Sequence, residues 1–145
     1  MDYAIKNGVG RISVDNFYEI DLVSKVAGRY NKHVDVLLRI TPGIECHTHE
    51  YIQTGQIDCK FGFDITMLEE AVTAVITRHQ NITIKGLHAH IGSQIFETQC
   101  FHDEIDVLIQ TLSTLNEKFD IKLDEINIGG GIGVNGGDRN TLTPA

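Results

Sequence analysis

The sequence predicts an α/β fold, a partial (β/α)8 TIM barrel with about four consecutive parallel β/α units. Two features support this prediction. Short apolar runs typical of strands alternate along the 145 residues with segments whose apolar residues recur at helical spacing. Alternating strands and helices form right-handed βαβ units in a parallel sheet, and four such units are about half of a barrel of ~250 residues. A complete four-stranded α/β sandwich is the alternative.

The first half of the chain contains two of the four predicted strands. Residues 2–8 are expected to end a helix, and residues 11–15 follow as a short strand. Apolar residues recur every three or four positions from 17 to 30, which predicts an amphipathic helix. Residues 34–40 are the second predicted strand. The polar segment 42–63 that follows is longer than most connections, which indicates a functional loop.

The second half contains the other two strands, 82–91 and 125–128, and the second of these leads into three glycines. The pattern Thr66-x-x-Glu69 is typical of a capping box and predicts that a helix begins there. The apolar face of that helix is expected to contain Leu68, Ala71, Val72, Val75 and Ile76. A long amphipathic helix is predicted before the last strand, with an apolar face of Ile105, Leu108, Ile109, Leu112, Leu115 and Phe119.

The composition fits one soluble domain and excludes several classes of function. A net charge of −8 and 12 scattered basic residues argue against nucleic acid or an anionic membrane as partner. No apolar run approaches the ~20 residues that span a bilayer, and the N-terminus lacks the features of a signal peptide. Cys46, Cys59 and Cys100 are odd in number and far apart, which predicts reduced thiols in a cytoplasmic protein.

The segment 86–94 contains two histidines at strand spacing. Residues two apart on a strand point the same way, so His88 and His90 are expected to share a face that points into the barrel. They would lie near the carboxyl end of the strand, where barrel active sites are found. Gly92 and Ser93 open the following loop, where the Ser93 hydroxyl can donate to a phosphate.

Gly129, Gly130 and Gly131 follow a strand directly, so their backbone N–H groups are candidates for a phosphate-binding nest, with a plain tight turn as the alternative. They do not form a dinucleotide fingerprint, because no helix pattern follows. Arg39 is a charge in an apolar strand, and we expect it to enter the barrel interior near the histidines. The cluster His47-x-His49-Glu50 suggests a metal only weakly, since loops of many proteins contain such residues.

Six segments, in order and over nearly the whole chain, resemble one enzyme family. They are 8–15, 38–43, 48–56, 58–62, 86–94 and 127–133. Together they are similar to the diaminopimelate decarboxylases, fold-type III pyridoxal 5'-phosphate (PLP) enzymes with an alanine-racemase-like barrel. The HxHIGSQ form and the TGQxDxKFG loop favour this branch over the ornithine and arginine decarboxylases.

The resemblance implies roles for matching positions. His90 should stack on the pyridine ring of PLP, Ser93 and the Gly129–Gly131 nest should hold its phosphate, and Arg39 should lie beneath the cofactor. The family removes one carboxylate from meso-2,6-diaminopimelate to give L-lysine, the last step of lysine biosynthesis. A homodimer is expected for the full-length enzyme.

The resemblance also implies residues that are not found here. The lysine that binds PLP covalently lies further upstream in the family, and we do not expect Lys6, in Tyr3-Ala4-Ile5-Lys6, to replace it. The acidic partner of the pyridine nitrogen and the C-terminal β-domain are also absent. We therefore expect residues 1–145 to be the central part of a PLP-binding barrel domain, a fragment that is inactive alone and contains no catalytic residue.

Two other functions stay open at this point. A metal-dependent barrel hydrolase could use His88 and His90 as ligands, but it needs a further ligand that the sequence does not indicate. A non-catalytic remnant that binds PLP through the glycine nest is the other hypothesis.

Overall fold

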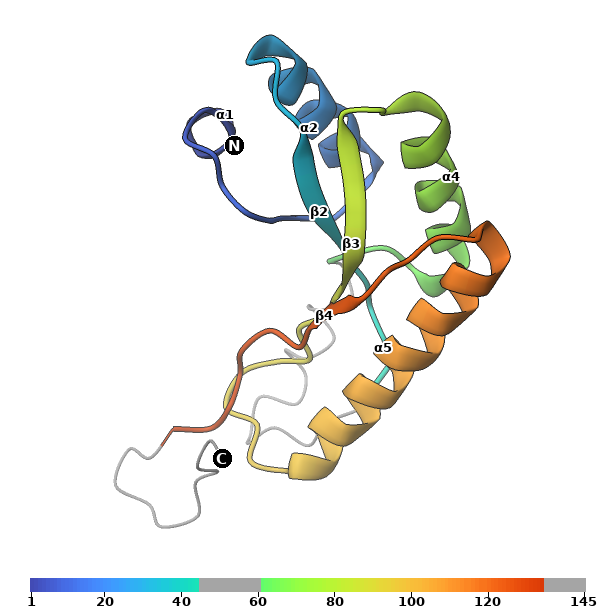
Figure 1. Ribbon diagram of the computed structural model, residues 1–145. Helices are drawn as coiled ribbons and strands as arrows, with labels where there is room; N and C mark the ends of the chain where they lie inside the picture. Colours follow the sequence, from blue (N-terminus) through green and yellow to red (C-terminus); the bar gives the residue numbers. More distant parts are fainter. Residues whose placement is uncertain (45–60, 135–145) are drawn as a thin grey trace.

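The computed structural model describes residues 1–44 and 61–134. Its helices are α1 (Asp2–Lys6), α2 (Phe17–Arg29), the short 3-10 helix η2 (Ile65–Met67), α4 (Leu68–Arg78) and α5 (Thr98–Phe119). Its strands are β1 (Ile12–Val14), β2 (Val34–Arg39), β3 (Ile82–His88) and β4 (Glu125–Asn127). The strands form one sheet in the order β1-β2-β3-β4, and every neighbouring pair is parallel. Strands alternate with helices, which confirms the predicted α/β fold (Figure 1).

One face of the sheet is apolar and packs against the helices. Val36 and Leu38 of β2, Val14 of β1 and Leu87 of β3 are fully buried on this face. They belong to one hydrophobic cluster with the apolar faces of α2, α4 and α5, which contribute Ile20, Val23, Val26, Ala27, Leu68, Ala71, Val72, Val75, Leu108 and Leu115. The two-residue period of the strands and the helical period of the covering segments therefore meet in a single core.

The opposite face of the sheet contains several charged side chains. Arg11, which precedes β1, donates from Nε to Oε2 of Glu125 at 2.7 Å, and its Nη1 lies 3.2 Å from Oδ2 of Asp35. Glu125 begins β4, so this side chain links the two outermost strands of the sheet. The outer strands of a flat four-stranded sheet are roughly 14 Å apart. The link therefore indicates a sheet that curves as a partial barrel does.

The strand predicted over 82–91 ends earlier than expected. β3 stops at His88, because the chain turns away after Ala89, whose N–H donates to the backbone O of Asn127 at 3.0 Å. His88 and His90 therefore do not lie on one strand. The expected alternation nevertheless continues, since Ala89 is buried between two half-buried histidines.

Two helix predictions, the Thr66 cap and the apolar faces of α4 and α5, were wrong in detail. Thr66 does not cap α4; instead Asp64 caps η2 by accepting the Thr66 N–H at 3.1 Å, and Glu69 pairs with Lys118 at 2.6 Å. α5 begins at Thr98, about two turns before Ile105, the first residue of its predicted apolar face. Its buried residues are Cys100, Glu104, Leu108 and Leu115, whereas Ile109 is 51% exposed, as is Ile76 of α4.

The predicted loop 42–63 falls mostly outside the described residues, together with Cys46, Cys59 and the His47-x-His49-Glu50 cluster. Cys100 is buried and is not in a disulfide. None of the described helices combines the length and the apolar character that a membrane crossing requires.

Candidate functional site

The candidate site lies where three neighbouring strands end. Arg39 is the last residue of β2, His88 the last of β3 and Asn127 the last of β4. The sheet register pairs Arg39 with His88 and His88 with Asn127. Arg39 and His88 lie on the polar face, because the residues before them, Leu38 and Leu87, are buried on the apolar face. Barrel enzymes place their active sites at this carboxyl end of the strands.

Arg39 is half-buried and is held from two sides. Its Nη1 lies 3.6 Å from Oδ1 of Asp15, which follows β1, and its guanidinium lies 5.2 Å from the centre of the Phe61 ring. The second carboxylate oxygen of Asp15 accepts the Gly62 N–H at 3.0 Å. The expectation that Arg39 lies near a histidine is confirmed by its pairing with His88.

Gly62 allows this packing. Its φ is +89°, and a Cβ atom would stand 2.8 Å from the backbone O of Arg39. The next residue, Phe63, donates its N–H to the same oxygen at 2.7 Å. Residues 61–63 therefore form a short extension of the sheet along the end of β2, as the isolated bridge between Ile40 and Phe63 also shows.

His88 is bound to the neighbouring strand end. Its Nδ1 lies 3.1 Å from Oδ1 and 3.2 Å from the backbone O of Asn127. Burial is the main cause that lowers the pKa of His88, assisted by the positive charge of Arg39, while the bonds to Asn127 oppose this shift. The imidazole of His88 is therefore predominantly neutral near neutral pH.

The glycine turn packs tightly against the loop after β3. Gly129 and Gly131 have φ of +71° and +94°, and a Cβ at Gly131 would stand 1.8 Å from the backbone O of Gly92. Ile95 donates its N–H to the O of Gly131 at 2.8 Å, which fixes the two loops side by side. Gly130 differs, because a Cβ there would meet no atom of the described residues within 4 Å.

Two of the three N–H groups of the predicted nest already have partners. The Gly129 N–H donates to Oδ1 of Asn127 at 2.8 Å, and the Gly130 N–H donates to Nδ1 of His90 at 3.3 Å. Within residues 1–44 and 61–134, the Gly131 N–H makes no hydrogen bond. The nest is therefore organised by side chains, a feature that the run of glycines alone does not reveal.

The structure brings the predicted site residues together on adjoining segments. His90 contacts the glycine turn, Arg39 lies at the adjacent strand end, and Ser93 is exposed in the loop that packs against Gly131. A half-buried imidazole, a guanidinium, an exposed hydroxyl and the backbone N–H groups of the glycine turn fit a flat ring that bears a phosphate. These residues are therefore chemically suited to PLP.

Sequence reasoning missed two residues of the site, Asp15 and Asn127. Asp15 follows β1 and Asn127 ends β4, and such positions at strand ends are a usable signal in a barrel. Lys6, in contrast, is an exposed residue at the end of α1 rather than on a strand. No group of three metal-binding side chains occurs in the described ranges, so His88 and His90 gain no third ligand there.

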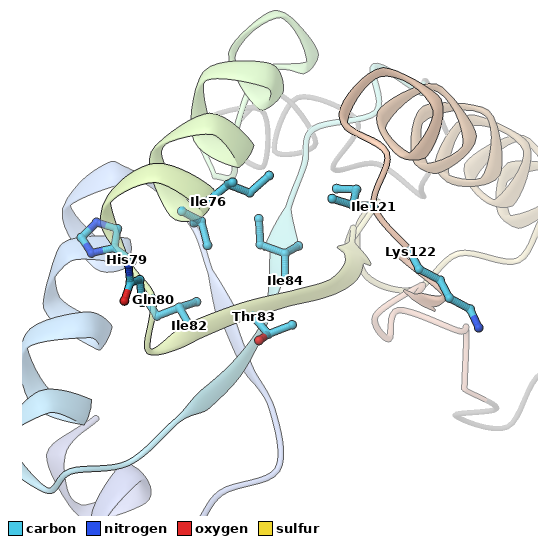
Figure 2. Close-up of a pocket in the computed structure, with 9 residues that line it drawn as sticks. Ile76, His79, Gln80, Ile82, Thr83, Ile84, Ile121 and Lys122 are labelled. Atoms are coloured by element: carbon cyan, nitrogen blue, oxygen red, sulfur yellow. The ribbon is translucent and has the colours of Figure 1, made fainter.

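A separate hollow lies at the other end of β3. It has a volume of about 330 Å³ and is lined by α4, by the first residues of β3 and by Ile121 and Lys122. Figure 2 shows isoleucine side chains around it, with the Lys122 ammonium directed away. His79 lines the hollow too, but its Nε2 is engaged with Asp21 at 2.9 Å. This hollow is apolar and distant from the strand ends that form the candidate site.

Residues 1–143 match the family model of the pyridoxal-dependent decarboxylases, pyridoxal binding domain. The chain belongs to this family. Diaminopimelate decarboxylase of Synechocystis sp. is 50% identical over 123 residues, which cover 85% of this chain and 26% of that protein. The enzyme of Bacillus subtilis is 42% identical over 133 residues, which cover 90% of this chain and 30% of that protein.

Solved structures agree with this assignment. The diaminopimelate decarboxylase of M. jannaschii in co-complex with L-lysine superposes with a TM-score of 0.78 at 26% identity, over 96% of this chain and 33% of that one. A variant of the Helicobacter pylori enzyme gives 0.82 over 99% of this chain and 37% of that one, and at 23% identity it shows the fold alone. The partial barrel is thereby confirmed. The chain spans 26% to 34% of the length of the curated relatives that it matches.

Proposed function

We propose that this chain is the central part of the PLP-binding barrel of a diaminopimelate decarboxylase. The enzyme would remove one carboxylate from meso-2,6-diaminopimelate and release L-lysine, the last step of lysine biosynthesis. The observation that best supports this proposal is the convergence of Arg39, His90, Ser93 and the Gly129–Gly131 turn at the ends of three parallel strands. The identity of 50% over 123 residues with a diaminopimelate decarboxylase supports the choice of substrate.

The side chains of this site would hold and orient PLP. The Ser93 hydroxyl and the backbone of the glycine turn would bind the phosphate, which needs donors rather than a fixed cation. The His90 imidazole, already against Gly130, would stack on the pyridine ring, and Arg39 would lie beneath the cofactor. When bound, PLP supplies the electron sink for the carbanion left by loss of CO2.

Other parts of the enzyme would complete the chemistry. We propose that the covalent lysine and the acidic partner of the pyridine nitrogen come from segments of the barrel outside residues 1–145, with a C-terminal β-domain beyond them. The resemblance further implies a cytoplasmic homodimer. Residues 1–145 alone would accordingly release no lysine.

The direct test is an assay of the intact protein that carries these residues, supplied with PLP. Formation of L-lysine and CO2 from meso-2,6-diaminopimelate, and not of putrescine from L-ornithine, is the expected result. Decarboxylation of ornithine instead would refute the assigned substrate. PLP binding with no product from either substrate would indicate the non-catalytic remnant, whereas stoichiometric zinc in the purified protein would indicate the hydrolase.

A further inference from the structure

We propose that His88 is a positioning residue of the phosphate site, which acts through the side chain of Asn127 on the glycine turn. The inference rests on the proposed function, since it assigns a role in PLP binding to a histidine that would not touch the cofactor. Neither His88 nor Asn127 was among the residues predicted to bind PLP. Their contacts form a continuous path from the end of β3 to the first glycine of the turn.

The path begins with the Gly129 N–H, which can only donate. It lies 2.8 Å from the Asn127 amide, so the atom that faces it must be the oxygen, Oδ1, and not the amide nitrogen. This contact fixes the orientation of the Asn127 amide. The same oxygen lies 3.1 Å from Nδ1 of His88, and the backbone O of Asn127 lies 3.2 Å from it.

Two acceptors facing Nδ1 determine the tautomer of His88. The proton must be on Nδ1, and in the neutral ring Nε2 therefore has none. Burial and the adjacent Arg39 favour this neutral ring, because each disfavours a second positive charge. His88 thus acts as a single, directed donor to Asn127.

The geometry of the turn depends on this donor. Gly129 has a φ of +71° and its Cβ position is only 2.8 Å from the backbone O of Ala89, so a small shift there moves Gly130 and Gly131 as well. Asn127 receives two donors on one oxygen and is therefore held in one rotamer. Without the His88 donor, only the Gly129 N–H holds that amide. The turn is then placed less firmly, and its Gly131 N–H, which makes no hydrogen bond within the described residues, is presented less well to a phosphate.

A pair of substitutions separates this role from a merely structural one. Asparagine at position 88 places an amide N–H close to the position of Nδ1, whereas glutamine places its amide close to Nε2. In the intact protein, we expect His88→Gln to weaken PLP binding about tenfold, the loss of one well-placed hydrogen bond. We expect His88→Asn to stay within about threefold of the unaltered protein, and pyridoxal, which lacks the phosphate, to bind both variants equally.

Controls and outcomes follow from the same path. His33 is an exposed histidine before β2, and His33→Gln should change the affinity for neither PLP nor pyridoxal. The double variant His88→Gln, Asn127→Ala should bind PLP no more weakly than Asn127→Ala alone, because the two residues act along one path. Equal losses for PLP and pyridoxal, unchanged PLP binding by His88→Gln, or additive losses in the double variant would overturn the proposal.

A measurement without substitution guards against variants that do not fold. Two-dimensional ¹H–¹⁵N spectra of the imidazole nitrogens in the unaltered protein should show His88 protonated at Nδ1 only. A proton on Nε2 refutes the proposal even if the protein binds PLP. Failure of the unaltered protein to bind PLP, with the expected His88 tautomer, instead counts against the proposed function.

Discussion

Glu104 gives the sharpest prediction of stability. It lies on the buried face of α5 between Cys100 and Leu108, its exposed fraction is 0%, and neither carboxylate oxygen has a hydrogen-bond partner among the described residues. Burial raises the pKa of Glu104 from 4.5 to about 8. The folded protein therefore keeps the proton on Glu104 over a range of pH in which the unfolded chain has lost it.

The sign and size of the effect follow from this difference. Between pH 4.5 and about 8 the folded state binds more protons than the unfolded state, so the free energy of unfolding falls as pH rises. At about 1.4 kcal/mol for each tenfold change in the dissociation constant, the loss is on the order of 5 kcal/mol once both states are ionised. Below pH 4.5 the carboxyl is neutral in both states and this contribution no longer changes.

The assay is urea unfolding of the unaltered protein and of Glu104→Gln at several pH values from 5 to 9. Glutamine has nearly the same shape and does not titrate, so the difference in free energy between the two proteins isolates Glu104 from the histidines. We expect the variant to become more stable, relative to the unaltered protein, as pH rises. Glu117→Gln, at an exposed position of the same helix, should leave the pH dependence unchanged. Parallel pH profiles for Glu104→Gln and the unaltered protein would refute the reasoning.

Three further predictions concern close packing and charge. Gly86→Ala should destabilise the protein by about 2–3 kcal/mol in urea unfolding, because its Cβ would stand 1.7 Å from the backbone O of Glu125. Gly131→Ala should abolish PLP binding and lower the melting temperature, because its Cβ would stand 1.8 Å from the backbone O of Gly92. Gly130→Ala, whose Cβ meets no atom of the described residues within 4 Å, should weaken PLP binding but leave the melting temperature unchanged. Asp15→Asn keeps an acceptor for the Gly62 N–H but removes the negative charge 3.6 Å from the guanidinium of Arg39. It should weaken PLP binding and change the free energy of unfolding little. Equal losses of PLP binding and of stability would contradict a role in the site.

Local periodicity was enough to predict the order of strands and helices. Val34, Val36 and Leu38 alternate, and Leu68, Ala71, Val72 and Val75 recur at helical spacing, and both sets are buried in one core. The segment around His90 and the run Gly129–Gly131 could also be recognised as a site, because each follows a strand directly.

What could not be predicted depends on contacts between distant parts of the chain. Asp15 meets Arg39 and Gly62 only because β1 and β2 are adjacent in the sheet, and no local pattern reports this. Glu104 was not part of the predicted apolar face of α5, because a charge is expected to face solvent, yet it is buried while Ile109 of that face is exposed. The end of β3 at His88 likewise depends on β4, since Asn127 receives the Ala89 N–H.

The central claim is that the ends of β2, β3 and β4 bind the cofactor, and a crystal structure of the intact protein with PLP tests it most directly. We expect the phosphate to contact Ser93 and the backbone of Gly129–Gly131, with the pyridine ring against His90 and Arg39 beneath it. PLP bound elsewhere, for example in the apolar hollow lined by Ile76 and Ile121, would contradict the claim.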